Sequence, residues 1–287
     1  MATIKFKTNA KCGGCVAAIG AKLNTLMASD DWSIDLADPN KVLEVKVDLA
    51  PAIVIAAVKE AGSRPNNYKR MAARQRQTYG EEVANVLTHG AGMLFGMTAI
   101  IILMMAAIRS GNPWAIGSFA VYAVCMTLSY VTSTFYHAST HARQKRLLRR
   151  FDHGAIYLHI AGTYTPFTLL ALRQEGYWGW SLFAVIWIAA VAGVCLSFRK
   201  MRKKDHLKTV CYLAMGWVVI IAFKPLLHVF RETGSMDVLY WLIGGGLFYT
   251  VGCLFFFLDK YKYMHPVWHF FVLGGSICHF ISIYLLV

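Results

Sequence analysis

The chain has 287 residues, 57% of them hydrophobic, and a mean hydropathy of +0.46. This composition is typical of a polytopic membrane protein and excludes an ordinary soluble enzyme. Most of the formal net charge of +14 belongs to residues 67–287, which hold 21 Lys and Arg against 8 Asp and Glu. No basic face with interleaved aromatic residues is present, so we predict membrane lipids and no nucleic acid as partners.

The first 68 residues predict a small α/β domain. Alternation of apolar and polar residues indicates strands, and apolar residues at helical spacing indicate helices. In chain order the expected elements are strand 3–8, helix 15–27, strand 32–36, strand 42–48, helix 51–61 and strand 66–69. This β-α-β-β-α-β order over about 70 residues is the ferredoxin-like arrangement.

A Cys-x-x-Cys pair, Cys12 and Cys15, lies between the first expected strand and helix. Two thiolates on a loop suit Cu(I) or another soft metal ion; the alternative is a redox or degenerate pair that binds no metal. Irregular spacing and an odd total of seven cysteines argue against a disulfide framework. We expect buried, unreactive side chains at the other five cysteines, which lie in apolar segments. These are Cys125, Cys195, Cys211, Cys253 and Cys278.

A polar, basic stretch joins this domain to the apolar part of the chain. We interpret residues 69–90 as a basic linker followed by an amphipathic lead-in helix near 81–88. The predicted domains are therefore 1–68, the linker and lead-in 69–90, and a membrane domain 91–287.

The membrane domain is predicted to be all-α, with seven transmembrane helices. A spanning helix needs about 20 apolar residues, and seven segments approach or exceed that length. They are 91–108, 114–136, 153–172, 178–198, 209–228, 237–258 and 266–287.

Lys and Arg are concentrated in alternate loops, which sets the predicted orientation. Five lie within 143–150, six within 199–208 and two within 260–262. The intervening loops hold little positive charge beyond Arg109, Arg173 and Arg231. The positive-inside rule then predicts a protein of the inner cell membrane with a cytoplasmic N-terminus and an external C-terminus.

Polar residues end three of the apolar segments on the same predicted side. His137 ends the second segment, Asp152 begins the third, and His265 and His269 begin the seventh. Buried imidazoles and carboxylates at such positions are costly and indicate a functional site. Any one of these histidines alone could simply satisfy a hydrogen bond at the interface. Their shared side, depth and residue type favour a metal ion between helices.

Zinc suits this set of side chains. His265 and His269 are four residues apart and share one helix face. With His137 they supply three imidazoles, which leaves a fourth position for water, as in catalytic zinc sites. We predict that Asp152 holds or deprotonates this water and that Ser133 orients the water or a substrate carbonyl.

Four motifs resemble the bacterial hemolysin III family, which belongs with the adiponectin and progestin receptors and, more distantly, the alkaline ceramidases. They are Gly80-Glu-Glu-Val-Ala-Asn-Val-Leu-Thr-His-Gly90, Ser133-x-x-x-His137, Asp152-His-x-x-Ile-Tyr-Leu-x-Ile-Ala-Gly-Thr-Tyr-Thr-Pro166 and His265-x-x-x-His269.

The resemblance covers residues 78–287 and implies a seven-helix fold with a cytoplasm-side zinc site. The family's three-histidine pattern falls on His137, His265 and His269. Its Asp position falls on Asp152 and its Ser position on Ser133. The receptor relatives imply hydrolysis of lipid amides such as ceramide.

Residues 1–68 resemble the heavy-metal-associated domains and copper chaperones. The likeness rests on Cys12-Gly-Gly-Cys15 between a first strand and helix. In that family a Met usually lies two positions before the first Cys, and here Ala10 stands there, which weakens the expectation of metal binding.

Three functions remain open from the sequence. The first is an integral membrane zinc hydrolase acting on lipid or amide substrates. The second is a non-enzymatic membrane sensor or regulator in which zinc braces the helices. The third is a hemolysin-type pore, which is least favoured because no helix carries a continuous polar stripe. The substrate and the oligomeric state are left undetermined.

Overall fold

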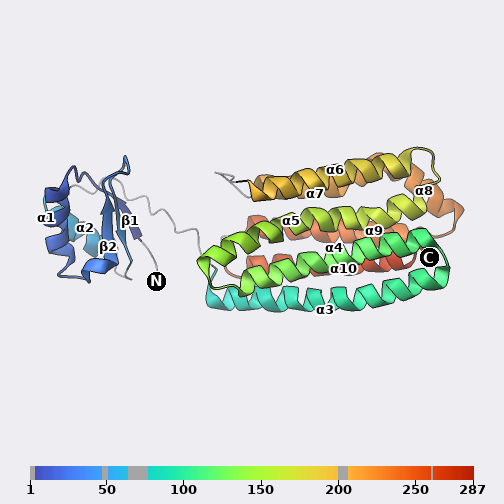
Figure 1. The fold of residues 1–287 in the computed structure, drawn as a ribbon, viewed down its shortest axis with the longest axis horizontal. Helices are drawn as coiled ribbons and strands as arrows, with labels where there is room; N and C mark the ends of the chain where they lie inside the picture. Colours follow the sequence, from blue (N-terminus) through green and yellow to red (C-terminus); the bar gives the residue numbers. More distant parts are fainter. Residues whose placement is uncertain (1–3, 47–50, 64–76, 200–205, 260) are drawn as a thin grey trace. The chain divides into compact units, whose positions relative to one another are not determined.

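The computed structural model describes residues 4–46, 51–63, 77–199, 206–259 and 261–287 (Figure 1). The chain divides into two compact units, Met1–Arg76 and Gln77–Val287.

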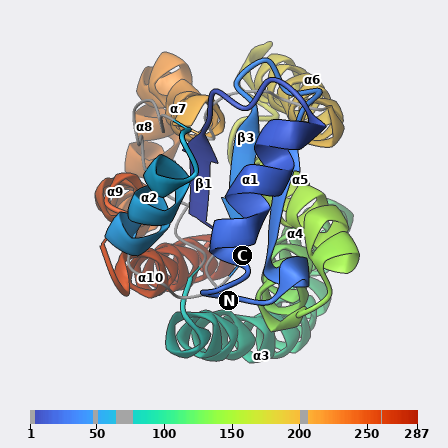
Figure 2. The same cartoon turned by 90° about the vertical axis from the view of Figure 1, so that its left-hand side faces the viewer.

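The N-terminal unit contains a three-stranded antiparallel sheet with two helices. Its elements are β1 (Ile4–Lys7), α1 (Gly13–Leu23), the short 3-10 helix η1 (Ser29–Asp31), β2 (Trp32–Asp35), β3 (Val42–Val45) and α2 (Pro51–Glu60). The strand order is β1-β3-β2, with Leu43 of the central strand opposite both Phe6 and Ile34. α1 and α2 lie together on one side of the sheet (Figures 1 and 2).

A single apolar core explains this arrangement. Side chains that alternate along β1 and β3 and side chains at helical spacing on α1 and α2 point into the same layer. The largest buried ones are Phe6, Ile19, Leu23, Leu43, Val45, Val54 and Val58. Gly62 follows α2 with a φ of 73°, as expected for the glycine that ends a helix. The expected strand 66–69 lies outside the described residues, so the ferredoxin-like fold stays a prediction.

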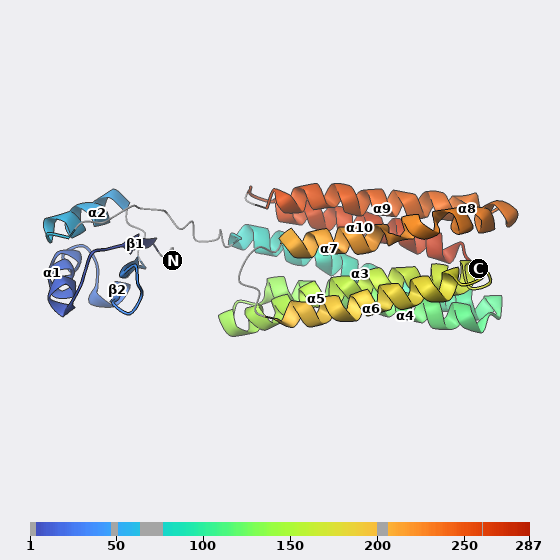
Figure 3. The same ribbon diagram turned by 90° about the horizontal axis from the view of Figure 1, so that it is seen from above.

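The second unit is a bundle of long helices that lie side by side along one axis (Figures 1 and 3). Its elements are α3 (Tyr79–Ser110), α4 (Pro113–Ala138), α5 (Ala142–Pro166), the π-helical turn η2 (Phe167–Ala171), α6 (Trp178–Phe198), α7 (His206–Trp217), the 3-10 segment η3 (Val218–Ala222), α8 (Phe223–Glu232), α9 (Met236–Phe257) and α10 (Met264–Tyr284).

Six segments of the described chain are long and apolar enough to cross a membrane. They are α3, α4, α6, the continuous stretch Lys208–Glu232, α9 and α10. α5 contains most of the expected segment 153–172, but it begins with basic turns and its mean hydropathy is too low for the same criterion. It packs against α4 and α6. The structure therefore supports six spanning helices, and a seventh stays a prediction.

Local sequence signals explain where α3 begins and ends. The Thr78 hydroxyl accepts the backbone N–H of Glu81 while the Glu81 carboxylate accepts the N–H of Thr78, which forms a capping box. Gly111 ends the helix in the left-handed conformation, with φ 64°. Residues 81–88, which we expected as a separate lead-in helix, form the first turns of α3.

The two faces of α3 have different environments. Leu87, Leu94 and Ile101 repeat every seven residues and are more than 60% exposed, as a lipid-facing stripe should be. On the opposite face Gly92 lies against Tyr130 of α4, and a β-carbon there would come within 2.3 Å of the ring. Close approach through a small residue is how membrane helices gain packing contacts without help from water.

The expected helix 209–228 is broken at its centre. α7 ends at Trp217, and η3 follows before α8 begins. The Tyr164 hydroxyl of α5 donates to the Gly216 carbonyl at 2.7 Å and accepts the Val219 N–H at 2.9 Å. Irregular backbone within a membrane needs such partners, because lipid offers none. The break therefore depends on Tyr164 of α5. The sequence of α7 alone could not have predicted it.

Candidate metal centre

Three histidines from two helices meet at one end of the bundle. His137 lies in the last turn of α4, and His265 and His269 lie in the first two turns of α10. One ring nitrogen from each lies within 4.8 Å of the other two. The centroid of the His137 ring is 5.2 Å from each of the other two rings, whose own centroids are 4.6 Å apart. The structure thus brings together the three predicted ligands.

The start of α10 is tied to the start of α3. Tyr263 takes the left-handed conformation, with φ 62°, immediately before the helix. Its backbone N–H donates to the Glu81 carboxylate at 2.9 Å, the same carboxylate that caps α3. Pro266 fits in the first turn, where its missing N–H costs nothing. This anchor fixes the turn of α10 that carries His265 and His269.

A carboxylate orients His137. Oε2 of Glu82 lies 2.7 Å from Nδ1 of His137, and Oε1 of Glu82 lies 2.7 Å from the Lys145 ammonium. A carboxylate only accepts hydrogen bonds, so Nδ1 of His137 carries the hydrogen and Nε2 keeps its lone pair. This carboxylate–histidine arrangement is the usual support of a metal-binding imidazole.

A hydroxyl orients His269 in the same way. Oγ1 of Thr88 lies 3.2 Å from Nδ1 of His269 and donates its own hydrogen to the Ala84 carbonyl at 2.9 Å. It therefore accepts from Nδ1 of His269. Nε2 of that ring is buried without a hydrogen-bond partner among the described residues, and the residue itself is 0% exposed. A metal cation would satisfy a buried lone pair of this kind.

α3 contributes several supporting residues that sequence reasoning missed. Glu81, Glu82 and Thr88 make the contacts above. His89 stacks on His269 with ring centroids 3.5 Å apart, and both of its ring nitrogens are buried without a hydrogen-bond partner in the described chain. All four residues lie in the quoted motif 80–90, to which we had assigned no site role. The available signal was the recurrence of polar residues every three or four positions in an apolar helix.

The two predicted assisting residues lie in different surroundings. Ser133 is buried one turn before His137 on α4. Asp152 lies on α5 with its Oδ2 4.0 Å from Nδ1 of His153. Both residues line a cavity that is described next. The Asp152 carboxylate is not part of the close ligand group that the described histidines form. The roles of Ser133 and Asp152 stay predictions.

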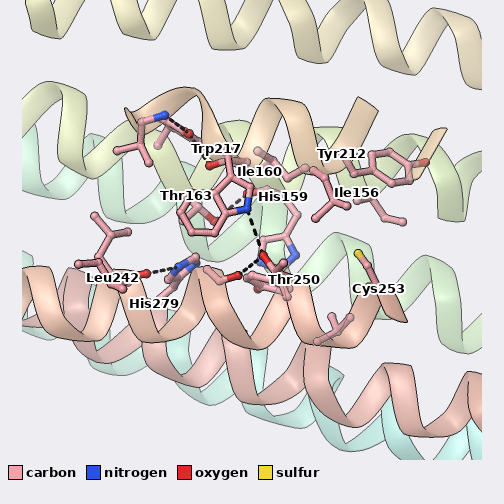
Figure 4. A pocket seen from close by; sticks show the side chains of 18 of the residues that line it. Ile156, His159, Ile160, Thr163, Tyr212, Trp217, Leu242, Thr250, Cys253 and His279 are labelled. Atoms are coloured by element: carbon pink, nitrogen blue, oxygen red, sulfur yellow. Dashed lines mark hydrogen bonds between the residues drawn. The ribbon is translucent and has the colours of Figure 1, made fainter. Parts of the chain in front are cut away.

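A cavity of about 620 Å³ lies within the same unit (Figure 4), and its lining does not include His137, His265 or His269. Its walls come mainly from α5, α7, η3, α9 and α10, and most of the lining side chains are apolar. His89 and Trp268 line it and also contact the metal-centre rings, with Trp268 5.0 Å from His269 between centroids. Ligand pockets for molecules of lipid or drug size have comparable volumes. The volume and the apolar walls suit a hydrocarbon chain.

The Cys-x-x-Cys pair has a simpler environment. Cys12 immediately precedes α1 and is exposed, and its sulfur lies 3.9 Å from that of Cys15. Hydrogen bonds from the backbone of Lys11 and then of Cys12 lower the pKa of the Cys15 thiol, which favours the thiolate that soft metals bind. Of the five cysteines expected to be buried, Cys278 is buried and Cys195 on α6 is exposed. The other three are partly buried: Cys125, Cys211 and Cys253.

The known proteins that we report match the second unit of the chain. Residues 77–280 match the family described as Haemolysin-III related. Hemolysin-3 of Bacillus cereus is 42% identical over 210 residues, which cover 73% of this chain and 93% of that protein. The Hemolysin-3 homolog of Bacillus subtilis (strain 168) is 40% identical over 206 residues, which cover 72% of this chain and 94% of that protein. The family match begins where the second unit begins.

Proposed function

This chain belongs to the haemolysin III-related family of integral membrane proteins, and from that premise we propose that it is a zinc-dependent membrane hydrolase of lipid or amide substrates. The observation that carries the proposal is the group formed by His137, His265 and His269, which a cavity of lipid size approaches through His89 and Trp268.

The side chains present fit a zinc ion with an open position. Three neutral imidazoles are the protein ligands of a common class of catalytic zinc site. Two of them keep their Nε2 lone pairs available because Glu82 and Thr88 engage Nδ1. Bound zinc would supply an activated water and polarise a carbonyl group.

Two further side chains would assist the reaction, Asp152 by transferring protons and Ser133 by orienting the reacting groups. Asp152 lines the cavity and is suited to accept a proton from water and return it to a leaving amine. Ser133, buried beside His137, would orient the carbonyl or the water. The apolar walls exclude bulk water, which strengthens polar interactions with the reacting group.

The proposed orientation places this centre at the cytoplasmic side of the inner membrane. His137 precedes the basic first turns of α5, and His265 follows Lys262 in the α9–α10 connection. Both connections belong to the positively charged loops, which remain cytoplasmic in membrane proteins. The N-terminus would then be cytoplasmic and the C-terminus external.

A non-enzymatic regulator is the second candidate. The histidines come from α4 and α10, and α3 contacts the second nitrogens of His137 and His269, so a bound ion would join three helices. In that case zinc would stabilise one arrangement of the bundle without turnover.

The N-terminal unit is proposed to be a heavy-metal-associated module that binds Cu(I) or a similar soft ion. The neighbouring sulfurs of the exposed Cys12 and the partly buried Cys15 support this assignment. Thiolate ligands select soft metals, whereas imidazoles and water suit zinc.

One experiment separates the candidates for the membrane unit. We would purify the full chain, determine its zinc content, and assay release of amine and fatty acid from a panel of long-chain lipid amides in liposomes. Zinc-dependent release supports the hydrolase. Stoichiometric zinc with no release from any amide or ester favours the regulator, and leakage of the liposomes without hydrolysis favours the pore.

A further inference from the structure

Two histidines line the cavity away from the metal centre. His159 of α5 and His279 of α10 are 6% and 8% exposed. Nε2 of His159 and Nδ1 of His279 are buried and have no hydrogen-bond partner among the described residues. Figure 4 shows both rings among the side chains that line the cavity.

The hydrogen bonds of their other nitrogens bear on what each ring offers to the cavity. Nε2 of His279 lies 3.2 Å from the Leu242 carbonyl, which only accepts, so Nε2 carries the hydrogen and Nδ1 is an acceptor. Nδ1 of His159 lies 3.2 Å from Oγ of Ser129. A hydroxyl can donate or accept, and in the tautomer in which Ser129 donates, Nε2 of His159 carries the hydrogen and is a donor. Charged imidazolium is disfavoured in this apolar setting, so both rings are neutral.

The packing around these rings holds them in place. The Tyr249 ring contacts both, with centroids 6.2 Å from His159 and 5.4 Å from His279. Its hydroxyl is already bonded to Oγ of Ser276 at 2.8 Å. A β-carbon on Gly245 would come within 2.2 Å of the His279 ring, so this position of α9 must be glycine for His279 to be seated here.

The pair lies deep in the bundle. His279 follows His269 by ten residues on α10, which is about 15 Å along the helix axis. That distance is about half the thickness of the hydrocarbon core of a bilayer. A donor and an acceptor without partners at this depth are costly unless a ligand satisfies them.

We propose that His159 and His279 form a binding subsite for a neutral hydroxyl group carried in the middle of a long hydrocarbon chain. With the Nε2-protonated tautomer of His159, one hydroxyl can donate to Nδ1 of His279 and accept from Nε2 of His159. A carboxylate cannot donate, and an ammonium group cannot accept. The subsite rests on the proposed function in one respect, since it assumes that the polar end of the same lipid lies at the metal centre.

The test uses two fatty acids that bind without being turned over. 12-Hydroxyoctadecanoic acid carries its hydroxyl about 15 Å from its carboxyl carbon when extended, which is the rise that α10 sets between His269 and His279. Octadecanoic acid lacks the hydroxyl. Competition of each against radiolabelled octadecanoic acid would be measured on the full chain in lipid nanodiscs. We expect the hydroxylated acid to bind roughly fivefold to tenfold more tightly, the gain from one net hydrogen bond.

Variants assign the gain to the pair. His279→Phe keeps a ring of similar size and should remove the preference while octadecanoic acid binds with nearly unchanged affinity. His228→Phe is the matched control, because His228 is exposed on α8 outside the cavity, and it should keep the preference. Unchanged binding of octadecanoic acid also shows that the variant is folded.

A positional series on the wild-type protein needs no variant. Acids with the hydroxyl at carbons 2, 12 or 17 should bind most tightly at the middle position. Equal affinity for all isomers and for octadecanoic acid, or a preference that persists in His279→Phe, overturns the subsite. Preference for the 12-hydroxy acid without hydrolysis of any lipid amide or ester keeps the subsite and overturns the hydrolase. Hydrolysis of a lipid amide without a preference for the 12-hydroxy acid keeps the hydrolase and overturns the subsite.

Discussion

The two predicted metal-binding sites of this chain are built in opposite ways. Cys12 is exposed and Cys15 is partly buried, and their sulfurs are close because the two residues are three positions apart at the start of α1. His137 and His269 are 132 residues apart in sequence, buried, and supported by Glu82 and Thr88 of a third helix. The first site is a local motif that any loop of the right shape could display. The second exists only when α3, α4 and α10 are assembled. The two sites should therefore respond differently to mutation.

The largest effect is expected from loss of a ligand in the buried centre. His269→Ala should remove nearly all bound zinc from the purified protein, because two imidazoles are too few for a stable site. Hydrolysis of the lipid amide should fall to background with it. His228→Ala is the control and should change neither quantity. Full zinc occupancy in His269→Ala would show that the three histidines do not hold the ion.

A second substitution separates chemistry from metal binding. Asp152→Asn should keep full zinc content and lower the hydrolysis rate by roughly 10²–10⁴-fold, the usual contribution of general acid–base catalysis. Zinc content and initial rates on the same preparation are the measurements. A rate within about twofold of wild type would remove Asp152 from the mechanism.

A third substitution tests Glu82, the carboxylate that contacts Nδ1 of His137. Glu82→Gln removes the charge that holds Nδ1, and zinc affinity should fall by roughly 10–100-fold, as for other such supporting partners. Competition with a zinc chelator measures it. Glu232→Gln, at an exposed carboxylate on α8, is the matched control. Equal affinities in the two variants would mean that Glu82 serves the fold alone.

A fourth concerns the N-terminal unit. The double variant Cys12→Ser and Cys15→Ser should lose about one equivalent of Cu(I) and keep all of the zinc, because histidine ligation needs no thiolate. The fold should survive, since Cys12 lies outside the core of this unit and Cys15 is only partly buried against it. Circular dichroism checks the fold, and equal Cu(I) uptake by wild type and variant would refute soft-metal binding.

The smallest effect is a pH dependence of Cys15. Backbone hydrogen bonds lower its pKa below the ordinary value of 9.0, so the thiolate forms at lower pH than in a free cysteine. Its alkylation by iodoacetamide should therefore rise with pH earlier than that of a reference thiol. Mass spectrometry of the modified peptide gives the rate at each pH. A profile identical to that of free cysteine would contradict the hydrogen bonding at the start of α1.

Much of the fold could be predicted because periodicity reports on local burial. The described strands and helices of the N-terminal unit begin and end within a few residues of the expected positions, and Gly62 after α2 takes the left-handed conformation. Six of the expected spanning segments are long and apolar enough to span. The apolar pattern of α5 is weaker than that of the other expected spanning segments. A helix that packs between α4 and α6 can bury threonines such as Thr163 and Thr165 in place of apolar side chains.

Residue types and charges in the sequence alone determined that this chain belongs in a membrane and that histidines recur at one of its sides. Hydrophobicity and charge act residue by residue, so they can be read without knowing the neighbours. The tertiary structure decided the rest. It brought Glu82 and Thr88 within hydrogen-bond distance of His137 and His269. It let Tyr164 bond the irregular backbone that follows α7. It also left one ring nitrogen each of His159 and His279 without a partner among the described residues, on one cavity. Hydrogen bonds act over about 3 Å, and only packing brings residues from distant helices to that distance.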